Sequence, residues 1–165
     1  SYKLIFPTGN VTAGKVLKVD SVSGSGTTGV GTMTFADAGG GASNSFHVYD
    51  MASAGSGDLV FNTELFDDGG NYNTSNGRYT APSDGKYLFN TSAITESSGS
   101  PTNIMFRKNG SNLAGGTDMF GYSSTTSIQG VASLIIDLSA SDYITVYSNN
   151  NVFANYLYFN GVKLY

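Results

Sequence analysis

The stretch GRYTAPSDGKYLFNTSA, residues 77–93, places two short β-type runs on either side of a proline turn. Pro82 fixes its own φ and therefore ends the first run. Gly77 and Gly85 supply positions where the chain can take a positive φ or pass close to another backbone. The stretch therefore predicts a strand, a tight turn and a second strand.

Two rings of the second run, Tyr87 and Phe89, are two residues apart, so they face the same side of a strand. Each such ring contributes about 1.5–3 kcal/mol when it is fully buried. Similar short patterns recur on both sides of this stretch at spacings of about eight to twelve residues, which is typical of an all-β sandwich or barrel. We expect strands at residues 46–50, 59–66, 77–81, 85–95, 102–108, 125–138, 142–148 and 155–164.

Alternation of apolar and polar residues is clearest in two of these segments. One face of 125–138 carries Ile128, Ala132, Leu134, Ile136 and Leu138, and one face of 142–148 carries Ile144 and Val146. These faces should build the core. Between the two segments, SASD (139–142) forms a tight turn in which Asp142 caps its own backbone. KNGSN (108–112) places an Asn-Gly step where a hairpin turn requires it.

The first 40 residues have a different pattern. Residues 15–22 and 30–35 alternate as strands and are joined by a run of Gly, Ser and Thr, which predicts a β-hairpin. A hairpin of this size is not stable alone, so we expect it to be an attachment segment that packs on other parts of the assembly. Asp37–Ser45 reads as a linker. The predicted domains are therefore 1–40, the hairpin segment, and 41–165, the sandwich.

Composition excludes several classes of protein. The formal net charge is −4 and only 8 residues are Lys or Arg, too few for a surface that binds nucleic acid. Without cysteine, neither a disulfide framework nor a thiolate zinc site can form. The longest apolar run, 134–136, is far too short to insert into a membrane.

Five landmarks in the sequence occur in an order that resembles a known family. They are Phe61 with Asn71 and Tyr72; GRYTAPSDGKYLFNTSA (77–93), whose matching positions are Gly77, Tyr79, Pro82, Gly85, Tyr87 and Phe89; RKNG (107–110); LIIDLSASDYITV (134–146); and YFNGVKLY (158–165), with Phe159 and Gly161. Together they resemble the globular-head domain of the first complement component, within the complement and tumour-necrosis-factor superfamily.

The resemblance implies a jelly-roll β-sandwich that assembles as a homotrimer, with the binding surface on loops. One departure is Ala140-Ser141, which stands where that family usually has glycine before the aspartate. Some members of the superfamily also hold calcium near the trimer apex. Here Asp67 and Asp68 are the weak candidate ligands, but their spacing lacks the order of a dedicated calcium loop. Solvated turn carboxylates are the favoured interpretation, so no cofactor is expected.

Catalytic residues are not indicated. His47 is the only histidine, and a lone His in a strand is far more often a surface or interface residue than a base. The only glutamates, Glu64 and Glu96, show no sign of forming a glycosidase pair. The glycine runs at 24–31 and 39–41 lack the Lys-Ser/Thr ending of a phosphate loop. We therefore predict a protein that is not an enzyme.

Tyrosines are concentrated in the second half of the chain, and Tyr143 and Tyr147 fall on the parity opposite to the core positions. Such outward rings either stack on sugars or become buried between subunits. We favour the subunit interpretation for strand tyrosines. The candidate ligand-binding loop residues are Tyr122, Asn149, Asn150 and Asn151, with Ser97–Thr102 and Asn112–Tyr122 as neighbouring polar loops.

Three functional hypotheses remain open at this point. The first is a trimeric virion-surface protein, a phage fibre tip or decoration protein, that binds a host-cell glycan or receptor and contacts other virion proteins through its N-terminal segment. GKVLKVDSVSGSG (14–26) loosely resembles the glycine-punctuated β-repeats before phage fibre tips. The second is a secreted, extracellular recognition or lectin module of the complement type. The third, and least favoured, is a polysaccharide-cleaving enzyme.

Overall fold

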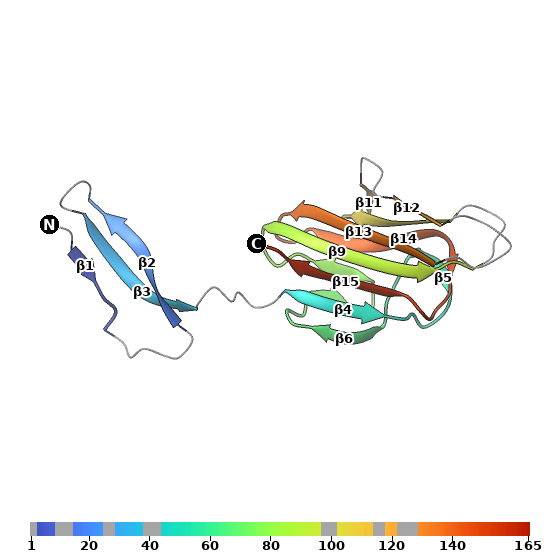
Figure 1. Ribbon diagram of the computed structural model, residues 1–165, viewed down its shortest axis with the longest axis horizontal. Coiled ribbons are helices and arrows are strands. Elements are labelled where there is room, and N and C mark those ends of the chain that lie inside the picture. Colours follow the sequence, from blue (N-terminus) through green and yellow to red (C-terminus); the bar gives the residue numbers. More distant parts are fainter. Residues whose placement is uncertain are drawn as a thin grey trace. The chain divides into compact units, whose positions relative to one another are not determined.

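The structure, a computed structural model, describes residues 3–8, 15–24, 29–37, 44–96, 102–113, 118–121 and 129–165. Every regular element in these ranges is a β-strand (Figure 1). Accordingly, the described residues include no helix with the length and apolar character needed to cross a bilayer. The chain divides into two compact units, Ser1–Gly41 and Ala42–Tyr165.

The first unit is a three-stranded sheet with the order β1-β3-β2. Its strands are β1 (Lys3–Ile5), β2 (Lys15–Ser23) and β3 (Val30–Asp37). The expected hairpin is present as the antiparallel pair β2 and β3, whereas the sequence did not predict β1, which pairs parallel to β3. Among the residues of this unit whose burial is described, only Gly31 is buried, and it has no side chain, so these residues form no buried core.

The second unit is a sandwich of two sheets. One has the order β13-β9-β15-β4-β6 and will be called the five-stranded sheet. Its strands are β4 (Ser45–Tyr49), β6 (Thr63–Asp67), β9 (Gly85–Ile94), β13 (Gln129–Leu138) and β15 (Tyr158–Lys163). The other has the order β11-β10-β14-β8-β7, with β12 added on β10 and β5 on β14. Its strands are β5 (Gly55–Asp58), β7 (Tyr72–Asn73), β8 (Arg78–Thr80), β10 (Thr102–Lys108), β11 (Ser111–Asn112), β12 (Asp118–Gly121) and β14 (Tyr143–Val152).

One expected strand, 59–66, is confirmed only in its second half, where Thr63–Asp67 forms β6. Residues 59–62 form no ladder, because here the chain crosses from β5 in one sheet to β6 in the other. Leu59 and Phe61 are buried during this crossing, which produces the apolar alternation of a strand. The other expected segments overlap observed strands, but β5, β7, β11 and β12 were not predicted.

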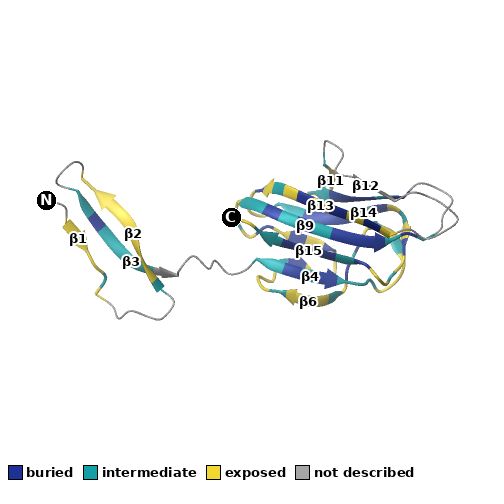
Figure 2. Ribbon diagram, viewed as in Figure 1, coloured by how far each residue is buried: buried dark blue, intermediate teal, exposed yellow. Residues whose placement is uncertain are grey.

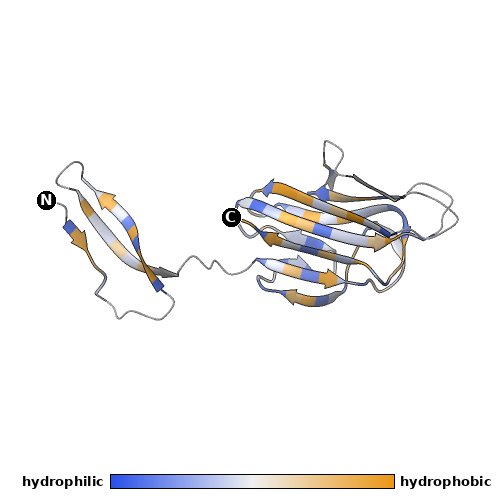
Figure 3. Cartoon of the chain, in the orientation of Figure 1, coloured by the Kyte–Doolittle hydropathy of each residue, from blue (hydrophilic) through white to orange (hydrophobic). Residues whose placement is uncertain are grey.

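The core lies between the two sheets (Figure 2), and most of its largest fully buried side chains are aromatic rings. Tyr87 and Phe89 are fully buried, as their two-residue spacing predicts. The predicted faces of β13 and β14 are also confirmed: Ala132, Leu134, Leu138, Ile144 and Val146 are buried, and Ile136 is half-buried against the core, whereas Val131 and Ile135 are exposed. Ile128 lies outside the described residues. Figure 3 shows the resulting alternation of hydropathy along the strands.

The SASD turn holds two hairpins together. The Ser139 N–H donates to Asp142 Oδ2 (2.8 Å), and Asn109 Nδ2 donates to Asp142 Oδ1 (2.7 Å). Lys108 Nζ lies 2.7 Å from the same carboxylate. Hydrogen bonds from Lys108, Asn109 and the Ser139 backbone lower the pKa of Asp142 to about 2. Ser141 has a φ of +73°, which explains why glycine is usual in this turn.

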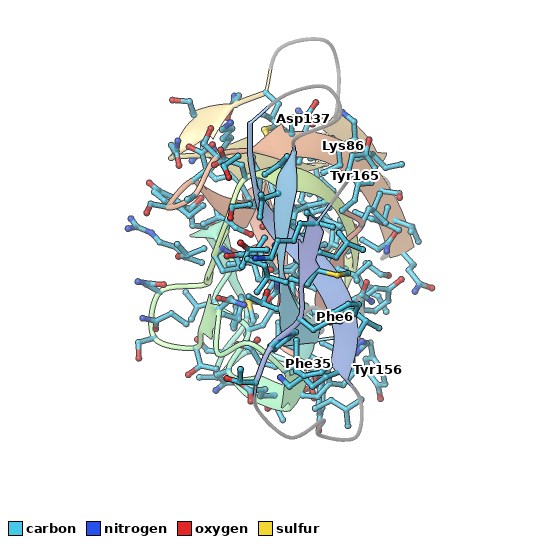
Figure 4. The ribbon with its side chains drawn as sticks, turned by 90° about the vertical axis from the view of Figure 1, so that its left-hand side faces the viewer. Phe6, Phe35, Lys86, Asp137, Tyr156 and Tyr165 are labelled. Carbon is cyan, nitrogen blue, oxygen red and sulfur yellow. The ribbon has the colours of Figure 1, made fainter. Side chains whose placement is uncertain are left out.

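The two ends of the second unit meet at one end of the sandwich (Figure 1). The Lys163 N–H donates to the carbonyl oxygen of Asn44 (3.2 Å), just before β4. The Lys86 N–H donates to the carbonyl of Tyr165 (3.1 Å), and the Leu164 N–H donates to the carbonyl of Lys86 (2.7 Å). Figure 4 shows Lys86, Asp137 and Tyr165 close together at this corner. Hydrogen bonds therefore hold the last three residues beside the start of β4 and the start of β9.

Candidate functional site

The face of the five-stranded sheet that points away from the core carries several partly exposed rings and aliphatic side chains. Strand register orders its side chains into three rows across the sheet, because residues opposite one another share a face. Row 1 contains Tyr49, Tyr158, Ser92 and Val131; row 2 contains Phe66, His47, Asn160, Asn90 and Ser133; row 3 contains Ser45, Val162, Leu88 and Ile135. We call this surface the outer face.

His47 lies in the middle row and takes part in packing. Its ring stacks on Tyr158, with centroids 5.6 Å apart and planes inclined by 21°, and it lies 6.2 Å from the Phe66 ring. Asn160 Nδ2 is 3.4 Å from His47 Nδ1, and Asn90 Nδ2 donates to Asn160 Oδ1 (3.2 Å). Burial lowers the pKa of His47 from its ordinary value of 6.5. The His47 ring is therefore held by stacking on Tyr158 and by its contact with the Asn160 amide.

The candidate calcium ligands are engaged in the turn that contains them. Asp67 Oδ2 accepts a hydrogen bond from the Tyr72 N–H (2.7 Å), and Asp68 Oδ2 accepts one from the Ser45 hydroxyl (2.5 Å). In the part of the chain that the structure describes, no three His, Cys, Asp or Glu side chains gather in a way that could hold a metal ion. One oxygen of each carboxylate is thus held within the turn, whereas Asp67 Oδ1 is buried without a hydrogen-bond partner.

The asparagine run lies in a strand, which corrects its expected position in a loop. Asn149, Asn150 and Asn151 belong to β14, where the pairing with β5 shifts register between Ser148 and Val152. Asn149 Oδ1 accepts from the Asn103 N–H (2.6 Å), and Asn150 Nδ2 donates to Thr102 Oγ1 (3.4 Å). Only Asn149 and Asn151 are exposed. Tyr122 and most of the two neighbouring polar loops lie outside the described residues.

Tyr143 and Tyr147 lie on the outer side of β14, each beneath an arginine. The Arg78 guanidinium carbon is 4.2 Å from the Tyr143 ring centroid, and that of Arg107 is 3.4 Å from the Tyr147 centroid. Both rings are therefore half-buried by cation–π contacts. Among the described residues of the sandwich, the most exposed rings are instead Tyr156, at 77%, and Tyr165, at 72%.

A hollow of about 600 Å³ borders row 1, where β4 ends and β15 begins. Its lining combines rings with polar side chains: Tyr49, Asp50, Gln129, Asn155, Tyr156 and Tyr158, with His47 and Leu157 also contributing. We call it the aromatic hollow. Asp50, Gln129 and Asn155 were not predicted as site residues, because three distant segments supply them and no motif connects these segments.

Comparison with known proteins agrees with this geometry. A family model described as "C1q domain" matches residues 45–162, which is most of the chain. The chain belongs to the C1q domain family. The match contains nearly the whole sandwich and none of the first unit. No curated protein sequence matches the chain.

Solved structures show the same fold for this C1q domain. The globular domain of a zebrafish complement 1qA protein aligns with a TM-score of 0.60 at 16% identity, covering 74% of this chain and 98% of that one. Murine APRIL at pH 5.0 aligns with a TM-score of 0.61 at 13% identity, covering 74% of this chain and 99% of that one. The all-β jelly roll of the C1q and tumour-necrosis-factor type is thus confirmed.

Membership of the C1q family also indicates the general kind of function. C1q domains are typically non-enzymatic recognition modules that act outside cells and assemble as trimers. The outer face carries rings and aliphatic side chains, which are common in the buried parts of interfaces. The aromatic hollow has the mixed chemistry of a small polar ligand site.

Proposed function

We propose that this C1q domain is the recognition head of a non-enzymatic homotrimer on a virion surface, a fibre tip or decoration protein that binds a host-cell glycan or receptor. The observation that carries the proposal is the apolar part of the outer face. Val131 and Ile135 are 59% and 61% exposed, and Leu88 and Val162 beside Ile135 are half-buried. Monomers rarely leave such a patch uncovered. Further copies of the same chain would cover it.

Assembly is tested by light scattering of the purified chain at micromolar concentration. We expect three times the chain mass of 17.2 kDa. Ile135→Glu should shift the mass towards the monomer, because it places a carboxylate where a copy would exclude water. Ser111→Glu, an exposed position on β11 in the other sheet, serves as the matched control. A monomeric wild type would contradict the proposal.

The virion setting rests on the first unit. Its small sheet leaves Leu4, Phe6, Val16, Val19 and Val22 exposed, which suits attachment to neighbouring subunits or to another virion protein. The sandwich encloses its own core, so we expect deletion of residues 1–40 to leave Phe46–Tyr165 folded. A cooperative thermal melt followed by circular dichroism checks this. A deletion variant without such a melt would show that the sandwich depends on the first unit.

Ligand binding is tested with a glycan array and a whole-cell assay. Wild type is compared with Tyr122→Ala and with the combined Asn149, Asn150 and Asn151 to Ala variant, after each is shown to be folded and to keep the assembly of the wild type. Loss of binding in either variant supports the loops and the β14 bulge as contact sites. If the wild type binds neither cells nor glycans, a purely structural decoration role replaces recognition.

A secreted recognition module of the complement type is the second candidate, and the match to the C1q domain model supports it equally well. The two settings differ in where the chain is found. Mass spectrometry of purified virus particles should detect the chain at many copies per particle if it is a virion protein. Detection only in particle-free culture fluid would favour the secreted module.

A further inference from the structure

The small sheet of the first unit has two faces of different chemistry. Strand register assigns each side chain to a face, because residues opposite one another point to the same side. Apart from Lys15 at the end of β2, the described side chains of one face are all apolar: Leu4, Leu17, Val19, Val22, Met33 and Phe35. We call this surface the first-unit apolar face. The opposite face is mostly polar and includes Lys3, Lys18, Ser21, Ser23, Thr32 and Thr34, with aliphatic residues between them.

A β-bulge in β2 keeps the first-unit apolar face free of polar residues along the strand. The pairing of β2 with β3 shifts register between Val19 and Ser21, which makes Asp20 an extra residue. A shift of one residue moves every later side chain to the other side of a strand. Without the bulge, Ser21 would follow Val19 on the apolar face, whereas with it Val22 takes this place. The backbone irregularity therefore extends the apolar surface.

The first-unit apolar face is left largely uncovered by its own unit. Its members on β1 and β2 are between 38% and 69% exposed, and its members on β3 are half-buried. Gly31 lies on this face beneath Leu4, since a Cβ built on Gly31 would be 3.3 Å from Leu4 Cδ2. A sheet of this size needs something packed on its apolar side for stability, and monomers rarely expose such a patch. We therefore expect a partner to cover it.

The connection to the sandwich brings copies of this face together. Residues 38–44 join β3 to Ser45, the first residue of β4. Ser45 belongs to row 3 of the outer face, together with Ile135 and Val162, which are proposed above to contact other copies. A linker of this length spans at most about 25 Å, so each first unit stays near that contact. Tethering by a short linker gives a mutual effective concentration of about millimolar.

We propose that the first-unit apolar faces of the three copies in the homotrimer pack against one another, so that three small sheets close into a stem. The apolar side chains lie inside this stem, and lysine, serine and threonine lie outside. A closed ring of three identical contacts leaves no copy of the face uncovered. Lys15 is the only described charged residue on the face, so a partner that is itself apolar fits it. This inference rests on the proposed function, because it starts from the homotrimer and adds a second interface to it.

The first experiment cross-links single cysteines in the full chain, which has no cysteine of its own. Val19→Cys places a thiol on the first-unit apolar face, and Lys18→Cys places one on the opposite face of the same strand. A short bis-maleimide reagent joins two thiols only where they come close together, and a denaturing gel separates joined chains from single ones. We expect joined chains for Val19→Cys, in a share that dilution does not change, because the sheets belong to one trimer. Lys18→Cys, the matched control, should remain as single chains.

The second experiment tests whether contact between the faces orders the sheet. Val19→Asp places a carboxylate on the first-unit apolar face, where packing of the copies would bury it without a partner. Hydrogen exchange of the β2 and β3 amides, followed by mass spectrometry, should then be about tenfold faster or more than in wild type. Lys18→Asp, on the opposite face, should leave the exchange unchanged. Light scattering should give a trimer for both variants, because the outer face is intact.

The outcomes separate this inference from the proposed function. If wild type is a trimer but Val19→Cys stays single, or Lys18→Cys is joined equally, the stem is wrong and the homotrimer stands. The face then belongs to the chain's own sandwich or to another protein. Joined chains that disappear on dilution would indicate contacts between separate trimers and would also overturn the stem, as would unchanged exchange in Val19→Asp. A monomeric wild type would overturn the proposed function and the stem together.

Discussion

Phe159→Ala should lower the free energy of unfolding of the sandwich by about 3–5 kcal/mol. The Phe159 ring is fully buried on β15, in the middle of the five-stranded sheet. Its centroid is 4.8 Å from that of Phe46 and 5.8 Å from that of Phe89. Rings of Phe61, Tyr72 and Phe106, from the crossing segment and the other sheet, each lie 6.0 Å away. Truncation leaves a cavity that these rings cannot all refill.

Urea unfolding followed by circular dichroism measures this loss, with all samples at one protein concentration because assembly contributes to apparent stability. Phe153→Ala is the matched control: Phe153 is the same residue type, is 38% exposed, and should cost far less. If the two variants lost equal stability, the packing of rings around Phe159 would not be the main source of stability.

Gly161→Ala should cost about 1–3 kcal/mol, although it adds only one methyl group. A Cβ at Gly161 would lie 2.5 Å from Phe89 Cδ1, 2.8 Å from the Leu88 carbonyl oxygen and 2.9 Å from Phe46 Cε1. The carbonyl belongs to the neighbouring strand and cannot rotate away. At position 161, the inner face of β15 therefore has room only for glycine.

Thermal and urea melts of Gly161→Ala, beside Gly55→Ala, test this. Gly55 lies on β5 with no atom within 4 Å of a built Cβ, so alanine should be tolerated there. A Gly161→Ala protein as stable as Gly55→Ala would mean that β9 and β15 can move apart at little cost.

Much of the fold could be predicted because its signals are local. Alternation within β13 and β14 identifies the core face from neighbouring residues alone. The same local signal misleads where Leu59 and Phe61 are buried between sheets rather than in a ladder. It also gives no sign of β1, because a short parallel pairing with β3 depends on contacts distant in sequence.

The candidate site was harder to predict. Asparagine runs favour turns, but a register shift in β14 takes up Asn149–Asn151 within a strand. The positive φ of Asp50 and Tyr156 arises from hydrogen bonds between two turns about 100 positions apart. The residue types at these positions therefore do not predict the conformation. Ser141 shows the converse case, since the family pattern indicates a glycine-like position and the serine adopts that conformation.

Hydrogen bonds hold Leu164 and Tyr165 beside Lys86, and Lys163 beside Asn44. The first and last residues of the sandwich are therefore close together in space. A few residues could join Tyr165 to Asn44, and the chain could then be opened at an exposed turn elsewhere as a circular permutant. The same geometry suits insertion of the sandwich into another protein. It can be spliced into a surface loop of an unrelated carrier through two adjacent strands, while the aromatic hollow at the far ends of β4 and β15 stays clear of the junction.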